Sequence, residues 1–203
     1  MFPKFRQGFS QDASGKLDIV RIDTGVKSLN ELFSSFSGAS FGRGLYRIVR
    51  ARDLSVWNDR ITLGFPAFAG RITCFGYDWL GRTFAVDTER TEEGEPGVVM
   101  FEPGTGEALE VPANVRTFHE MELDEYRDAA LASNFHATWL ANGGAEPAYD
   151  QCIGYNVPLF LGGKDGEENL ELTDLEVYWH ISAQLIAKAR GLPPGTRINV
   201  NGA

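Results

Sequence analysis

The feature that most constrains the fold of this chain is a series of four short apolar segments. Residues 71–77, 82–87, 98–101 and 108–111 are rich in residues that favour β-strands. The two connections that follow the second and third segments contain Glu-Gly-Glu-Pro-Gly and Glu-Pro-Gly-Thr-Gly, which suit tight turns. Because short turns of this kind join antiparallel neighbours, the sequence predicts a meander of β-hairpins.

Helical periodicity occurs on both sides of this meander. The spacing of apolar residues predicts a short helix from Val26, a helix over residues 123–141 and a C-terminal helix. Thr173-Asp174-Leu175-Glu176 has the spacing of a capping box for the last of these. Its apolar stripe is Tyr178, Ile181, Leu185 and Ala189.

Shorter elements are predicted elsewhere. Residues 45–49 form a strand, residues 53–57 start a helical turn, and residues 152–161 form an edge strand or an ordered loop because they contain a proline. With 203 residues, of which 43% are hydrophobic, the chain fits one α+β domain: an antiparallel sheet packed against a few helices. We assign residues 1–43 to an N-terminal arm with a short helix, the arm containing one short strand around residues 17–22, and residues 44–203 to the domain itself.

Charge is unevenly distributed along the chain. The sequence has 28 acidic and 19 basic residues, a net charge of −9, which opposes binding to the phosphates of nucleic acids. Residues 83–128 contain 13 acidic and 3 basic side chains, whereas residues 1–82 have a net charge of +5. We therefore expect no direct nucleic-acid binding, and the acidic middle of the chain would attract a basic protein.

The expected environment is the cytoplasm. The two cysteines, Cys74 and Cys152, are not in CxxC spacing, which favours reduced thiols over a disulfide framework. The first residues lack the apolar core of a signal peptide, and no apolar run is long enough to span a bilayer.

Residues suited to catalysis or metal binding are few. None of the three histidines lies in HxH or HExxH spacing, and His119 with Glu120 and Glu122 would place its ligands on alternate faces of an extended segment. Cys152 has no flanking signature of an activated nucleophile. We predict no metal, no cofactor and no enzymatic activity. A hydrolase or metal enzyme that uses His119, His136 and Cys152 is the alternative.

The segment Tyr77-Asp78-Trp79-Leu80-Gly81-Arg82 connects two predicted strands and combines two aromatic rings, a carboxylate and a guanidinium. Two interpretations are open. The segment is either a packed corner with an Asp78–Arg82 ion pair or a binding surface, since aromatic residues and arginine dominate interface hot spots.

The acidic residues of the middle segment also have two interpretations, as a solvated face or as a surface that steers a basic partner. The candidate partner-binding residues are Tyr77, Asp78, Trp79, Arg82, Glu92, Glu93, Glu95, Glu107, Glu110, Glu120, Glu122 and Asp124.

Several segments together resemble one bacterial protein family. They are residues 75–87, the hairpin 101–107, the segment Gly154-Tyr155-Asn156-Val157-Pro158-Leu159-Phe160-Leu161-Gly162-Gly163, and residues 169–171 and 176–181. They are similar to the C-terminal domain of type VI secretion immunity proteins, a family long catalogued as a domain of unknown function and discussed beside the SMI/KNR-type (SUKH) immunity superfamily. The resemblance extends over about residues 44–190.

The resemblance implies a function. Described members of the family neutralise DNase effectors and have no assigned catalytic residues. We therefore expect a non-enzymatic immunity protein that binds a secreted nuclease and blocks its active site. On electrostatic grounds the acidic residues would attract a basic nuclease, and Tyr77, Trp79 and Arg82 are the candidate anchors. The alternative is a general protein-interaction or housekeeping module of the same fold with another partner.

Overall fold

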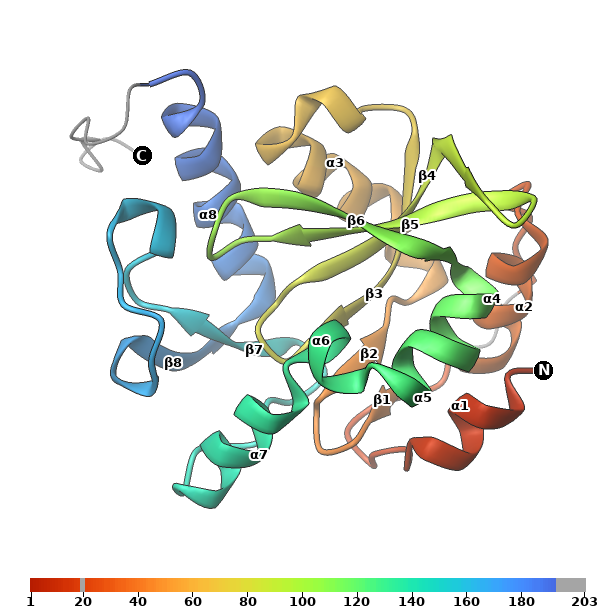
Figure 1. Ribbon diagram of the computed structural model, residues 1–203, viewed down its shortest axis with the longest axis horizontal. Coiled ribbons are helices and arrows are strands. Elements are labelled where there is room, and N and C mark those ends of the chain that lie inside the picture. The colour runs from red at the N-terminus through yellow and green to blue at the C-terminus, as the bar shows by residue number, and fades with distance from the viewer. Residues whose placement is uncertain (19–20, 193–203) are drawn as a thin grey trace.

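A six-stranded antiparallel sheet forms the centre of the computed structural model, which describes residues 1–18 and 21–192 (Figure 1). The strands lie in the order in which the chain makes them, from β1 to β6. Their bounds are β1 Ser40–Phe41, β2 Tyr46–Ile48, β3 Ile72–Asp78, β4 Thr83–Glu92, β5 Glu95–Glu102 and β6 Glu107–Asn114. The predicted meander of hairpins is therefore confirmed.

The β4–β5 hairpin is longer than the sequence indicated. Residues 91–97 were expected to form a connection, but the strands pair as far as Glu92 and Glu95. Glu93 and Gly94 make the turn with φ angles of 49° and 83°. A glycine next to a residue in the left-handed region supports a two-residue turn, so most of the expected loop continues the strands.

Helices cover both faces of the sheet. Their bounds are α1 Pro3–Gly8, α2 Lys27–Phe36, α3 Leu54–Gly64, α4 Val115–Thr117, α5 Leu123–Glu125, α6 Arg127–Leu131, α7 Ser133–Ala141 and α8 Leu175–Ala189. A π-helical turn, η3 (Phe118–Glu122), joins α4 to α5, and the 3₁₀ turns are η1 Ala51–Asp53, η2 Pro66–Phe68, η4 Leu159–Leu161 and η5 Glu167–Asn169. No helix among the described residues has the length and apolar character to cross a bilayer.

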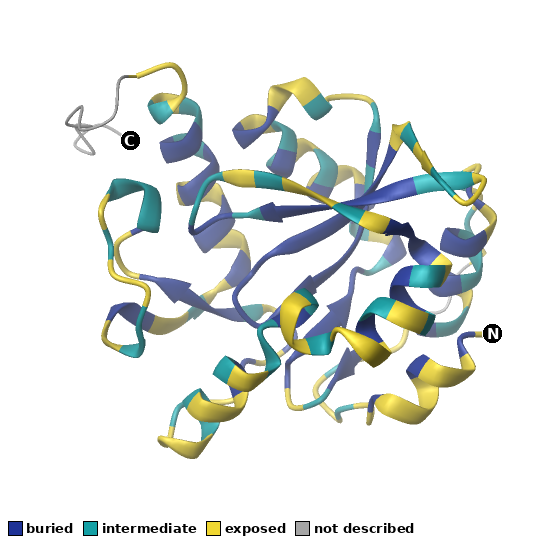
Figure 2. Cartoon of the chain, viewed as in Figure 1, coloured by how far each residue is buried: buried dark blue, intermediate teal, exposed yellow. Residues whose placement is uncertain are grey.

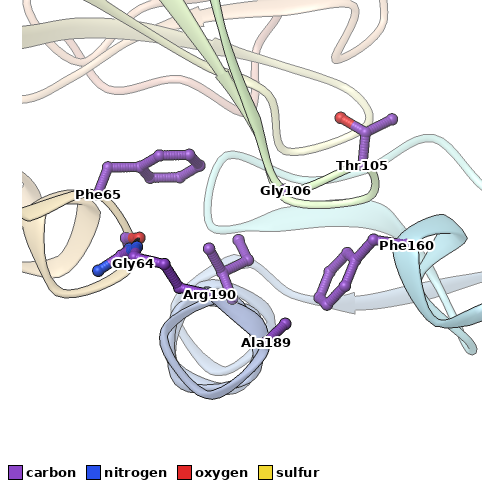
Figure 3. A pocket seen from close by; sticks show the side chains of 8 residues that line it. Gly64, Phe65, Thr105, Gly106, Phe160, Ala189 and Arg190 are labelled. Carbon is purple, nitrogen blue, oxygen red and sulfur yellow. Dashed lines mark hydrogen bonds between the residues drawn. The ribbon is translucent and has the colours of Figure 1, made fainter. Parts of the chain in front are cut away.

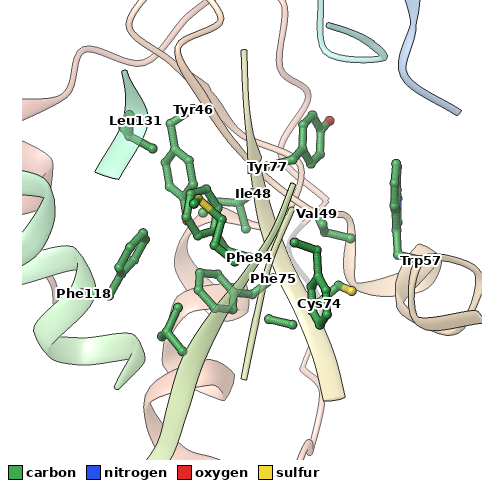
Figure 4. Packing of buried hydrophobic residues seen from close by; sticks show 14 of the residues in the cluster. Tyr46, Ile48, Val49, Trp57, Cys74, Phe75, Tyr77, Phe84, Phe118 and Leu131 are labelled. Carbon is green, nitrogen blue, oxygen red and sulfur yellow. The ribbon is translucent and has the colours of Figure 1, made fainter. Parts of the chain in front are cut away.

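The core lies on both sides of the central strands (Figure 2). On one face Phe118 of η3 packs against Phe75 and Phe84, and on the other Trp57 of α3 stacks on Tyr77 with ring centroids 5.8 Å apart (Figure 4). The register of β3 against β4 shifts between Cys74 and Gly76. This bulge lets residues 75 and 77 of one strand serve opposite faces.

A two-stranded sheet joins the main sheet at the Tyr77–Arg82 corner. It consists of β7 (Gln151–Tyr155) and β8 (Leu170–Asp174), which pair antiparallel. The Ile153 N–H donates to the Trp79 carbonyl at 2.7 Å, so this corner connects the two sheets. The prediction of an edge strand or ordered loop at residues 152–161 corresponds to β7 followed by η4.

Residues 1–43 do not extend from the domain as an arm. Phe2, Phe5 and Phe9 are buried in the core around α1, and α2 covers the same aromatic cluster. Gln11 bridges Phe41 of β1 in an antiparallel arrangement. The polar composition of the first 25 residues concealed three phenylalanines at helical spacing. Residues 19 and 20, at the centre of the strand expected there, lie outside the described residues.

Two predicted helices differ in detail. The expected helix over residues 123–141 is divided into α5, α6 and α7, with a left-handed residue at Ala132 (φ 49°). Helix α8 begins at Leu175, and its N-cap is Asp174, whose carboxylate accepts the Val177 N–H at 2.9 Å. The apolar stripe predicted for this helix is wrong at one position, because the Ile181 side chain is 52% exposed.

Candidate functional site

The corner between β3 and β4 is a buried ion-pair junction. Asp78 and Arg82 are both buried, and the Arg82 Nε donates to the Asp78 carboxylate at 2.6 Å. The other carboxylate oxygen accepts the N–H groups of Leu80 and Arg82 at 3.0 and 2.9 Å. Burial raises the pKa of Asp78, and the Arg82 guanidinium opposes that rise. Asp78 and Arg82 therefore form the packed corner with an ion pair that was the first of the two interpretations of this segment.

The aromatic side chains of the corner hold distant segments together. Trp79 donates its indole N–H to the Leu131 carbonyl at 3.0 Å, and Tyr77 donates its hydroxyl to the Tyr149 carbonyl at 2.6 Å. Trp179 of α8 donates to the Gly81 carbonyl at 2.6 Å. Because Tyr77 and Trp79 are almost completely buried, they are not available to a partner on the surface. The structure does not support the prediction that Tyr77, Trp79 and Arg82 anchor a partner, nor a surface role for Asp78.

A buried arginine that the sequence reasoning did not single out supports this junction. Arg47 of β2 donates to the carbonyls of Asp78 and Gln151 at 3.2 and 2.6 Å and lies over the Tyr77 ring at 4.8 Å. Arg47 thus connects β2, β3 and β7. The sequence signal for this role was an arginine within a short strand of apolar neighbours. Such a charge must be hydrogen-bonded when it is buried.

The other segments that carry the family resemblance also have structural roles. Gly104 lies against Tyr155, and a Cβ atom there would come within 2.8 Å of the tyrosine ring. The Leu159 N–H donates to the Gly104 carbonyl at 2.8 Å. Asn169 accepts the Val157 N–H and donates to the Val157 carbonyl at 2.9 and 2.8 Å. These residues fix the fold, so a partner surface is to be sought among other side chains.

Several of the predicted acidic residues make internal contacts. Glu95 accepts hydrogen bonds from the Ser28 N–H and hydroxyl at the N-terminus of α2. Glu120 accepts the backbone N–H groups of Lys4 and Phe5 in α1, both at 3.4 Å. Glu92 pairs with Arg90 at 2.5 Å. The first two carboxylates stabilise helix N-termini, where negative charge is favourable.

The remaining acidic candidates do not form one cluster. Glu93 lies at the tip of the β4–β5 hairpin, and Glu107 begins β6 at the opposite end of the sheet (Figure 1). From Glu107 to Asn114, which lies at the hairpin end of β6, the strand advances seven positions, or roughly 23 Å. Glu110 lies between them on β6 and Glu122 ends η3. Asp124 of α5 pairs with Lys4 at 3.3 Å.

An apolar groove lies beside β6, the last strand of the sheet. Its volume is about 220 Å³. We call it the β6 groove. Its lining residues come from β4, β5, β6, η3 and α6 or lie next to them: Phe84, Met100, Leu109, Glu110, Val111, Pro112, Phe118, Glu122, Ala129 and Ala130.

Two other hollows lie near α8. One, of about 260 Å³, is formed between the end of α3, the β5–β6 turn, η4 and α8 (Figure 3). Phe65, Gly106 and Phe160 line it, and Arg190 donates to the Gly64 carbonyl at its edge. The other, of about 140 Å³, lies between β7, β8 and α8 and includes Glu171 and Val177.

Two of the three histidines, His119 and His136, and both cysteines are buried. His119 is fully buried, with its Nδ1 2.7 Å from the Val115 carbonyl and its Nε2 3.1 Å from the Tyr46 hydroxyl. Burial lowers the pKa of His119 to about 4 and, with the charges of Arg47 and Arg43, that of His136 to about 4.

Burial also disfavours the charged form of the two thiols. Cys74 and Cys152 are free and buried, and burial raises the pKa of both. A thiol with a raised pKa is a poor nucleophile. Among residues 1–18 and 21–192 no group of three or more histidine, cysteine or acidic side chains is placed to hold a metal.

These observations define a class of protein: a single α+β domain built on an antiparallel meander, with a buried polar junction and an apolar groove beside its edge strand. Residues 113–186 match the family model described as T6SS immunity protein Tdi1, C-terminal. The match confirms the family resemblance in that part of the chain, from the end of β6 into α8. No curated protein matched the sequence.

The overall architecture recurs in a solved structure. The crystal structure of Atu4351 from Agrobacterium tumefaciens superposes with a TM-score of 0.63 over 91% of this chain and 89% of that chain. The two sequences are 15% identical. At this level of identity the comparison shows a shared fold.

Proposed function

We propose that this protein is an immunity protein of a type VI secretion system that binds a cognate antibacterial toxin and inhibits it without chemistry of its own. The match of residues 113–186 to an immunity family is the observation that carries the proposal. His119, His136 and Cys152 are buried, which lowers the pKa of the two histidines and raises that of the thiol. These shifts support a binding role over the hydrolase or metal-enzyme alternative.

The proposed partner is a nuclease with a basic surface. A nuclease needs cationic side chains for the phosphates of its substrate, and a protein with a net charge of −9 is attracted to them. Attraction of this kind raises the association rate and is weakened by salt, because the Debye length is about 8 Å at physiological ionic strength. The proposed location is the cytoplasm, where a nuclease toxin meets DNA and where two free thiols stay reduced.

Co-expression with the product of the open reading frame adjacent to its gene, as the candidate toxin, tests the proposal. We expect the protein to restore growth of cells that produce the toxin, and the purified protein to suppress DNA cleavage at equimolar concentration. A His136→Ala variant and a Cys152→Ala variant that remain folded are expected to protect equally well.

Two results would contradict the proposal. If the protein neither binds nor inhibits this candidate toxin, the immunity proposal is wrong and the alternative of a general interaction module is favoured. Loss of protection in a folded His136→Ala or Cys152→Ala variant would instead indicate an enzyme.

A further inference from the structure

The hollow between β7, β8 and α8, which we call the β8 hollow, has an apolar wall that solvent reaches. Val177 and Ile181 lie one turn apart on α8, so they share a face of the helix, and both line the hollow. Their side chains are 53% and 52% exposed, whereas Leu185, one turn further along and also in the lining, is buried. The wall therefore extends from a buried leucine to the surface.

A carboxylate lies on the other wall of the β8 hollow. Glu171 of β8 is paired with Gly154 of β7, so the two residues share one face of the small sheet. Helix α8 covers that same face, because a Cβ atom at Gly154 would come within 2.7 Å of the Tyr178 ring. Glu171, Gly154 and Tyr178 all line the hollow, and Glu171 is exposed. A carboxylate and two exposed aliphatic side chains therefore border the same cavity.

The contacts of Glu171 leave its charge in place. Among the described residues its carboxylate accepts the Asn156 side-chain amide, at 2.8 and 2.9 Å, when that amide is oriented to donate. A carboxylate has about four lone-pair sites, and a neutral amide does not cancel its charge. Lys188 shares the helix face of Ile181 but lies seven residues further along α8, or roughly 10 Å. Glu171 can therefore accept a cation from outside the chain.

The surroundings of the β8 hollow are acidic. Residues 164–176, which run through η5 and β8 into the first turn of α8 (Figure 1), contain six acidic side chains and one basic side chain. Lys164 and Arg60 each approach one of these carboxylates, at 3.9 and 3.0 Å, which leaves the segment negatively charged. A surface of this kind attracts a basic partner over about 8 Å at physiological ionic strength.

The β8 hollow lies entirely in the part of the chain that matches the immunity family. All of its lining residues fall between positions 154 and 185, and the match covers residues 113–186. The β6 groove and the hollow at the end of α3 include residues before position 113, such as Phe84 and Phe65. Among these three cavities, only the β8 hollow is formed wholly by the segment that carries the proposed function.

The size of the β8 hollow limits its occupant. At about 140 Å³ it is smaller than the roughly 300–1,000 Å³ of typical small-molecule sites, so it suits a single side chain of a protein. We propose that the β8 hollow is the docking site of a basic segment of the toxin, which inserts one apolar side chain against Val177 and Ile181 and places a lysine or arginine on Glu171. This inference rests on the proposed function and names the surface that performs it.

The apolar wall is tested by a double variant, Val177→Ser with Ile181→Ser. Its matched control is Val56→Ser with Leu63→Ser, because these side chains of α3 are 50% and 49% exposed and lie outside the family match. The probe is the product of the adjacent open reading frame in a catalytically inactive form, and its binding is measured by biolayer interferometry. We expect the hollow variant to raise the Kd at least ~10-fold and the control to bind like the wild type.

The carboxylate is tested by Glu171→Gln, which removes the charge and keeps an acceptor for the Asn156 amide. Its control is Glu122→Gln on η3, which removes one charge elsewhere. We expect both variants to slow association alike, because each reduces the long-range attraction by one charge, and only Glu171→Gln to speed dissociation, by at least ~10-fold. Thermal unfolding establishes that each variant is folded, and Glu171→Gln decides the matter if the apolar double variant does not fold.

The proposed site and the proposed function fail in different ways. Tight binding by the wild type that neither hollow variant weakens beyond its control refutes the β8 hollow and leaves the immunity function intact. Light scattering that shows a wild-type dimer, converted to a monomer in the apolar variant with unchanged affinity for the probe, assigns the hollow to a second copy and also refutes the proposal. A wild-type protein that does not bind the probe contradicts the proposed function and the docking site with it.

Discussion

Replacement of Phe5 by alanine is expected to destabilise the whole domain, although Phe5 belongs to the first helix of the chain. The Phe5 side chain is 1% exposed. Removing roughly 150 Å² of buried aromatic surface at about 25 cal/mol per Å² costs about 4 kcal/mol. This agrees with the roughly 3–5 kcal/mol observed for buried phenylalanine-to-alanine changes. The ring centroid of Phe5 lies 4.8–6.0 Å from those of Phe9, Phe36, Phe41, Tyr46 and His119.

Urea unfolding followed by circular dichroism measures this loss of free energy, and thermal unfolding measures the matching change in Tm. For a chain of this size each kcal/mol shifts the Tm by about 2–4 °C, so the Tm of Phe5→Ala is expected to fall by roughly 8–16 °C. Lys4→Ala is the control, because the Lys4–Asp124 pair is about half exposed and such pairs contribute less than about 1 kcal/mol. If Phe5→Ala costs no more than Lys4→Ala, then α1 is an appendage and its place in the core is wrong.

Three further predictions concern polar side chains that the fold uses. His119 has a pKa of about 4 in the folded protein and about 6.5 when unfolded, so the unfolded state binds more protons between these values and the free energy of unfolding falls as the pH is lowered through this range, by about 3 kcal/mol at most. Urea titrations at about pH 7 and about pH 5 should show a smaller fall in the free energy of unfolding for His119→Phe than for the wild type. An equal fall would contradict this. Asp174→Ala is expected to lower the free energy of unfolding by about 1 kcal/mol through loss of the α8 N-cap, whereas Thr173→Ala should cost less. The reverse order would make Thr173 the N-cap, as the capping box predicted from the sequence has it. Arg82→Met leaves Asp78 buried without its partner and should cost about 3–5 kcal/mol without changing the toxin affinity of the folded protein, and a loss of affinity alone would make Arg82 an anchor after all.

Local sequence information was sufficient for the meander and insufficient for the region after it. The hairpins of β3 to β6 depend on alternation and on turn residues, both of which lie within a few residues of each strand. The break between α6 and α7 has no glycine or proline to announce it. There the Leu131 carbonyl accepts the Trp79 indole N–H, and the Asp128 carboxylate accepts the Asn134 N–H at 2.7 Å, so a contact from a distant corner helps to divide the helix.

The same limitation explains the misplaced binding anchors. Aromatic rings and an arginine in a turn have the composition of an interface hot spot and also that of a buried junction. The difference depends on whether other segments cover the turn. Trp79 is covered by Leu131 and His136, and Gly81 by α8, which begins more than ninety residues later. No local pattern around residues 77–82 contains that information.

The acidic candidates show how a charge total becomes a testable surface. Summed along residues 83–128, all carboxylates count equally. In the structure Glu95 and Glu120 stabilise helix N-termini, so reversing their charge would weaken the fold and any loss of binding would be uninformative. The carboxylates of Glu93, Glu107 and Glu122 make no hydrogen bond or ion pair among the described residues, and Glu110 meets Arg90 at 3.9 Å. Electrostatic attraction to a partner can therefore be separated from stability at these solvated positions, where reversing the charge changes the association rate without removing a contact of the fold.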